Sequence, residues 1–82
     1  MAKPVYVGDV VQLTSGLAFK VTFASDPARP WHPVQFGSQW RVRRKRFEGG
    51  VTTFYGGGTV PMKLDRADAE AVAAILNSAC TP

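Results

Sequence analysis

The sequence predicts a small β-rich α+β domain in which four to five antiparallel strands precede one C-terminal helix. Three observations lead to this class. Glycine and proline recur at close intervals through the first 64 residues, apolar and polar residues alternate between them, and a helical repeat begins near residue 65. Two closures fit this order of elements, a small SH3-like barrel or a curled sheet with the helix across it.

The 82 residues form one predicted domain, with a strand portion at 1–64, a helix at 65–77 and a tail at 78–82. Apolar residues make up 45% of the chain, enough for a folded core. A domain near this size buries only about 60–65% of the surface that its unfolded chain exposes. A core this thin favours a binding face over a catalytic cleft.

Turn-forming residues divide the strand portion into short segments. In the second segment Phe19, Val21 and Phe23 share one pleat face, the period-two pattern of a half-buried strand. Three prolines at 24–33 predict a loop, and Pro61 makes the last strand an edge or bulged one. The predicted strands are residues 5–13, 17–23, 39–47, 51–55 and 59–64, and residues 34–36 are a candidate for a short edge strand.

Residues 65–77 carry the pattern of an amphipathic helix. Asp65 is a good N-cap, and Asp68 and Glu70 place negative charge in the first turn. Asn77 is the expected left-handed stop. The apolar stripe that should face the sheet consists of Ala69, Val72, Ala73 and Leu76.

Residues 7–16 read Val-Gly-Asp-Val-Val-Gln-Leu-Thr-Ser-Gly. This segment resembles the opening of YodC-like small bacterial proteins, whose pattern is Val-Gly-Asp-Val-Val-x-Leu-Lys-Ser-Gly-Gly-Pro. The resemblance implies a barrel-like opening hairpin with Gly8 and Asp9 at a tight bend, and it implies no activity. The helix at 65–77 is similar to the terminal helices of many small phage and high-GC bacterial proteins.

Basic charge is concentrated in one strand. The net charge is +4, but residues 1–64 alone carry +6, from nine Lys or Arg against three acids. Five of the ten basic residues lie within six positions: Arg41, Arg43, Arg44, Lys45 and Arg46. Such a charge surplus favours nucleic acid, anionic lipid or an acidic protein surface. Of these partners we expect nucleic acid or an acidic protein surface, and no membrane.

An extended chain sends alternate residues of this strand to opposite faces. Arg41, Arg43 and Lys45 then project from one face at a spacing of about 6.6 Å. The other face must bury Trp40 and Val42, and Arg44 and Arg46 cannot follow them unpaired. Either the strand leaves the core beyond Val42, or a bulge near positions 43–44 turns Phe47 inward. Both resolutions predict a protruding cationic ribbon.

The first functional hypothesis is nucleic-acid binding through this ribbon. Arginine forks bind phosphate oxygens, and Trp31, Phe54 or Tyr55 would offer faces for base stacking. Five phosphate contacts on duplex DNA would give a slope of log affinity against log salt of about −4.5. The competing interpretation is a merely solvated charged face.

The second hypothesis is a protein-binding accessory or inhibitor, phage-encoded and directed at a host nucleoprotein or defence complex. Its anchor would be Trp31, supported by Arg29, in the proline-stiffened loop. The competing interpretation is a tryptophan that folds back to cap the core. In this case the cations of the ribbon would meet acidic side chains.

We expect no enzyme, because no nucleophile and base stand in a recognisable pattern. A lone Cys80 and a lone His32 predict neither disulfide nor metal site, and no cofactor motif occurs. The start lacks a secretion signal and no apolar run suits a membrane span, so we expect a cytoplasmic protein, in the host cytoplasm if phage-encoded. An exposed edge at 34–36 or 60–64 would allow two copies to pair.

Overall fold

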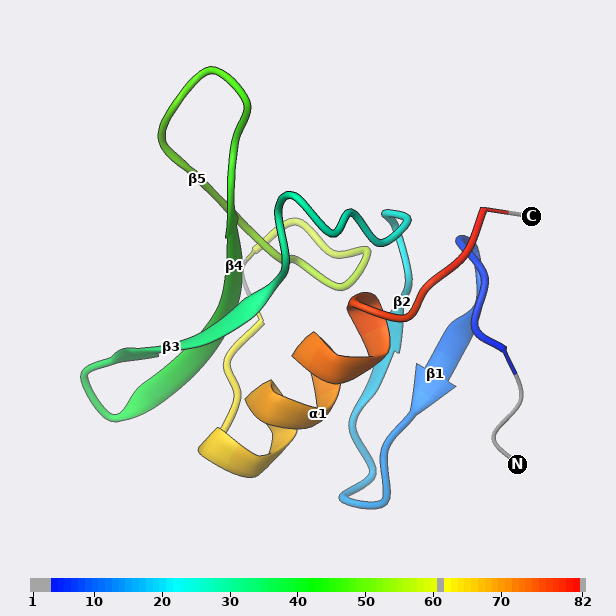
Figure 1. The fold of residues 1–82 in the computed structure, drawn as a ribbon. Coiled ribbons are helices and arrows are strands. Elements are labelled where there is room, and N and C mark those ends of the chain that lie inside the picture. The colour runs from blue at the N-terminus through cyan, green and yellow to red at the C-terminus, as the bar shows by residue number, and fades with distance from the viewer. Residues whose placement is uncertain (1–3, 61, 82) are drawn as a thin grey trace.

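The structure is a computed structural model that describes residues 4–60 and 62–81. These residues form two antiparallel sheets, one of two strands and one of three, and a C-terminal helix (Figure 1). The α+β class is therefore confirmed. The described strands pair as two separate sheets, so a closed SH3-like barrel is not confirmed. The elements are β1 (Val10–Gln12), β2 (Ala18–Lys20), β3 (His32–Phe36), β4 (Gln39–Lys45), β5 (Val51–Thr53) and α1 (Arg66–Leu76).

β3 and β4 form a hairpin whose loop has two residues, Gly37 and Ser38. Gly37 has φ +60° and Ser38 does not have a positive φ, the pattern of a type II′ turn with glycine first. So short a loop leaves one register available. Val34 lies opposite Arg41, and His32 opposite Arg43.

β4 is the central strand of the larger sheet. β3 pairs along one edge, and β5 pairs with residues 43–45 along the other. Nearer the start of β4, Trp40 and Leu64 exchange both backbone hydrogen bonds, at 2.8 and 3.0 Å. The predicted strand at 59–64 is thus reduced, in its described part, to a bridge at Leu64. Pro61, which has no backbone N–H to donate, lies outside the described residues.

The N- and C-terminal segments lie side by side. The Val7 N–H donates to the Cys80 carbonyl at 2.9 Å, and the Cys80 N–H donates to the Val5 carbonyl at 2.8 Å. The predicted tail therefore contributes a parallel bridge to the fold. A tight bend does occur at Gly8, where φ is +101° and the Asp9 N–H donates to the Tyr6 carbonyl at 3.0 Å.

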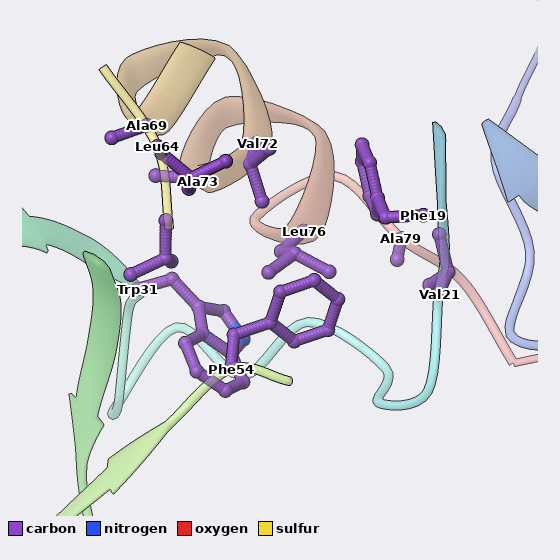
Figure 2. Close-up of a cluster of buried hydrophobic side chains, with 11 residues drawn as sticks. Phe19, Val21, Trp31, Phe54, Leu64, Ala69, Val72, Ala73, Leu76 and Ala79 are labelled. Atoms are coloured by element: carbon purple, nitrogen blue, oxygen red, sulfur yellow. The ribbon is translucent and has the colours of Figure 1, made fainter. Parts of the chain in front are cut away.

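The core lies between α1 and the two sheets. Figure 2 shows Trp31 and Phe54 beneath Leu76, and Phe19 and Val21 beside Ala79. Trp31 and Phe54 meet edge to face with ring centroids 5.6 Å apart. Phe23 was predicted to share the buried face of the second strand, but it is 40% exposed. It lies beyond the end of β2, with its ring centroid 5.8 Å from that of Trp31.

The helix begins as its sequence predicts and ends differently. The Asp68 N–H donates to the Asp65 side chain at 2.8 Å, a normal N-cap. The predicted left-handed stop at Asn77 is wrong, because its φ is −73°. The Asn77 amide instead accepts the Trp31 N–H at 2.7 Å and donates to the Trp31 carbonyl at 3.1 Å. It therefore ties the helix end to the start of β3.

Asn77→Ala should lower the free energy of unfolding by about 1–2 kcal/mol, because it removes both hydrogen bonds to the Trp31 backbone. Urea denaturation followed by tryptophan fluorescence measures the change. Ser78→Ala is the matched control, since it removes an exposed hydrogen bond in the same turn. Equal losses of unfolding free energy in the two variants would show that the hydrogen bonds between Asn77 and the Trp31 backbone stabilise the fold no more than an exposed hydrogen bond does.

Candidate nucleic-acid interface

Along the whole of β4, side chains alternate between the two faces of the sheet without a shift. Its pairing with β3 and β5 runs without interruption from Gln39 to Lys45, so the bulge predicted near positions 43–44 does not occur. Phe47 accordingly does not turn inward and is 77% exposed. The other predicted resolution, in which the strand leaves the core beyond Val42, is also wrong, because Arg44 is 7% exposed. The hairpin of β4 and β5 extends beyond the core only after Arg44 (Figure 1).

We call the side of the larger sheet that faces away from the core the outer face. Its charged members are Arg41, Arg43 and Lys45, which alternate along β4. Register places further side chains of β3 and β5 on the same side, because directly opposite residues point the same way. These are His32, Val34, Phe36, Val51 and Thr53.

Phe36 holds the two arginines of the outer face. The guanidinium carbons of Arg41 and Arg43 lie 4.8 and 5.1 Å from the centroid of its ring. Cation–π contacts at such sites are worth about 0.5–1 kcal/mol each. The Nε atoms of both arginines are buried and have no hydrogen-bond partner in the described structure. The outer face is therefore ordered by an aromatic ring rather than by carboxylates.

The charge on the outer face is uncompensated within the described residues. The ion pairs among the described residues join Asp26 to Arg29, Glu48 to Arg46 and Glu70 to Arg66, and none of them involves a cation of the outer face. β3, β4 and β5 contain no Asp or Glu. Three cations in a row without a counter-charge of their own will attract an external anion.

A shallow hollow lies on the outer face where β4 meets its neighbours. Its volume is about 180 Å³. Val34 and Val51 give it apolar walls, and Arg43 and Lys45 give it cationic ones. The residues that line it are His32, Val34, Arg43, Arg44, Lys45 and Val51.

Arg44 does not belong to an exposed ribbon, which corrects the sequence prediction. It is 7% exposed, and its guanidinium carbon lies 4.9 Å from the Phe23 ring centroid and 4.6 Å from that of Trp31. Burial lowers the pKa of Arg44, Arg29 lowers it further, and Asp26 raises it. The two rings stabilise a cation that the strand phase forces inward.

The second hypothesis loses its anchor. Trp31 is 2% exposed, so its indole cannot serve as a surface contact; it caps the core instead. Phe54, 1% exposed, is equally inaccessible for base stacking. Arg29 pairs with Asp26 at 3.0 Å and stacks with its guanidinium carbon 3.6 Å from the Phe47 ring centroid. Both residues named for protein binding are thus engaged within the fold.

The remaining predicted site residues lie at the margins of the outer face. Arg46 is exposed beyond the end of β4, 4.0 Å from Glu48. Tyr55 follows β5, is 43% exposed and lines a hollow of about 420 Å³ together with Thr53. The structure therefore brings together Arg41, Arg43 and Lys45, and it separates Arg44, Arg46 and Tyr55 from them.

Sequence reasoning missed the contribution of β3, which supplies Phe36, Val34 and His32 to the outer face. The sequence did contain information that predicts this pairing. A two-residue Gly-Ser loop between two strands determines which residues lie opposite one another. Counting outward from Gly37 and Ser38 pairs Val34 with Arg41 and His32 with Arg43.

Comparisons with protein-family models, with curated proteins and with solved structures found no match for this chain. The helix that the structure describes is too short to cross a membrane, and within residues 4–60 and 62–81 no group of metal-ligating side chains comes together.

Arg44→Met should leave the free energy of unfolding within about 1 kcal/mol of the native value or raise it, because a buried cation is replaced by an apolar side chain of similar length. Arg44→Ala should lower it by roughly 2 kcal/mol or more through the lost packing on Phe23 and Trp31. Urea titration distinguishes the two. A large loss in Arg44→Met would show that the charge itself stabilises the fold.

Asp26→Asn should destabilise the protein at neutral pH by a margin that disappears in acid. The Arg29 side chain, and then the Ala28 N–H, lower the pKa of Asp26 from 3.8. A lowered folded-state pKa gives stability that is present above 3.8 and is lost as pH falls through the folded value. Thermal melting of both proteins between pH 7 and pH 2 tests this, and a margin independent of pH would contradict it.

Proposed function

We propose that this protein is a small non-enzymatic binding protein that binds nucleic acid through the outer face of β3, β4 and β5. One observation carries the proposal: Arg41, Arg43 and Lys45 form a row of cations on a face where no strand supplies an acid. Arginine forks and a lysine ammonium are the groups that bind phosphate oxygens. A cytoplasmic setting with a reduced, free Cys80 suits this role.

The alternative, an inhibitor or accessory that binds an acidic protein surface, has less support. This alternative needs Trp31 as the residue that contributes most of the binding energy. Such hot-spot residues are usually large aromatic or arginine side chains that a partner can cover. Trp31 is 2% exposed and Arg29 is paired with Asp26. Only the attraction between opposite charges then supports this alternative, and no exposed hot-spot residue would make the contact specific.

Three cations predict a weaker salt dependence than five. If each of the three contacts one phosphate, the slope of log affinity against log salt is about −2.7 for duplex DNA and about −2.1 for a single strand. Fluorescence anisotropy of labelled mixed-sequence DNA and RNA at several salt concentrations measures it. A slope near −4.5 on duplex DNA would mean five phosphate contacts, two more than the row on β4 supplies.

Replacing Arg41, Arg43 and Lys45 with Gln should reduce affinity at least roughly tenfold at low salt, since about 1 kcal/mol is lost per charge-assisted contact. The matched control replaces Lys20, Lys63 and Arg66, three exposed cations outside the outer face. Both variants lower the net charge from +4 to +1, because three charges are removed from four. The control should lose less than roughly threefold.

Equal losses of affinity in the two triple variants would contradict the proposed site, because affinity would then depend on the net charge of the protein and not on the cations of the outer face. No binding by the native protein to DNA or RNA, even at low salt, would contradict the proposed function.

A further inference from the structure

The outer face contains more than charge. Phe36 is 41% exposed and Val51 is 45% exposed. Val34 is half-buried and lies opposite Arg41, so the cations of β4 have apolar side chains of β3 on one side and of β5 on the other. Duplex DNA presents mainly phosphate and sugar to a flat protein surface, so this apolar area would face nothing that matches it. A single strand also presents the flat faces of unpaired bases, which stack on aromatic rings and guanidinium planes.

We propose that the ligand of the outer face is single-stranded nucleic acid, with its phosphates along β4 and one unpaired base in the hollow beside Arg43. This inference rests on the proposed function and specifies its ligand. The cations lie at every second residue of a regular strand, about 6.6–6.8 Å apart, so they form a straight row. A straight row follows one extended backbone and leaves its bases free to turn toward β3 or β5.

The hollow has the size and chemistry of a site for one base. Its volume of about 180 Å³ equals that of roughly six water molecules at about 30 Å³ each, which leaves room for one planar base against its walls. Val34 and Val51 would contact the base, while Arg43 and Lys45 lie where the flanking phosphates would run.

Phe36 gives the same face a stacking platform. Its ring orders Arg41 and Arg43 and remains partly open to solvent, so a second base can stack on the ring or on a guanidinium plane. The Nε atoms of both arginines are buried, so a ligand would meet the ends of their guanidinium groups.

The test compares three labelled oligonucleotides of one length: a mixed-sequence single strand, its duplex, and a single strand in which the central nucleotides are abasic. The abasic strand keeps every phosphate and lacks the central bases. The single strand should bind roughly 5- to 150-fold more tightly than the abasic strand, since one stacked base contributes that much. The salt slope of the two strands should be the same, because the phosphates are unchanged.

Phe36→Leu keeps an apolar side chain and removes the ring. It should weaken binding of the mixed single strand by at least roughly fivefold, and it should weaken binding of the abasic strand less, because there only the ordering of Arg41 and Arg43 is lost. Phe47→Leu is the matched control, because Phe47 is 77% exposed and lies beyond the end of β4. It should leave both affinities unchanged, and circular dichroism confirms that each variant is folded.

Two failures are distinguishable. If the duplex and the abasic strand bind as tightly as the mixed single strand, the outer face reads phosphate alone, and this inference is overturned while the proposed function stands. If none of the three oligonucleotides binds at low salt, the proposed function fails and the inference fails with it.

Discussion

The single phase of β4 is the constraint on which the rest of the structure depends. A two-residue turn sets the strand in register with β3, and the alternation then runs unbroken to Lys45. One run of basic residues is thereby divided between two environments. Arg41 and Arg43 reach the outer face, while Arg44 must enter the core beside Val42. A bulge would have avoided the buried charge at the expense of the straight cationic row.

The buried arginine requires a particular environment, and Trp31 supplies much of it. Its indole lies 4.6 Å from the Arg44 guanidinium carbon and also packs edge to face on Phe54. The Trp31 backbone is held by both hydrogen bonds of Asn77. The end of α1, the start of β3 and the inner face of β4 are thus connected through one residue. A tryptophan buried in these contacts cannot also be the exposed anchor of an interface.

The sequence predicts those features that short-range physics determines. Asp65 caps α1 because its carboxylate reaches an N–H three residues away, and the apolar stripe repeats at helical spacing. The direction of Arg41 and Arg43 likewise follows from alternation alone. The burial of Arg44 could not be predicted in this way, since it depends on rings at positions 23 and 31 whose placement only the tertiary structure determines. For the same reason the local signal at Asn77 misled: a contact 46 residues away took precedence over its helix-end propensity.

The open charge of the outer face follows from where the acids are used. The chain has six acidic residues, and each one already has a partner elsewhere in the fold. Asp9 accepts the Tyr6 N–H, Asp26 and Glu70 pair with Arg29 and Arg66, Glu48 lies near Arg46, Asp65 caps α1, and Asp68 accepts the Ser15 hydroxyl. No carboxylate is left for the row of cations on β4. The repulsion between these like charges is offset by the contacts of Arg41 and Arg43 with the Phe36 ring and by solvent. A ligand that supplies phosphates and base faces together would replace the solvent with contacts of matching charge and polarity, because the apolar positions of β3 and β5 lie directly beside the cations.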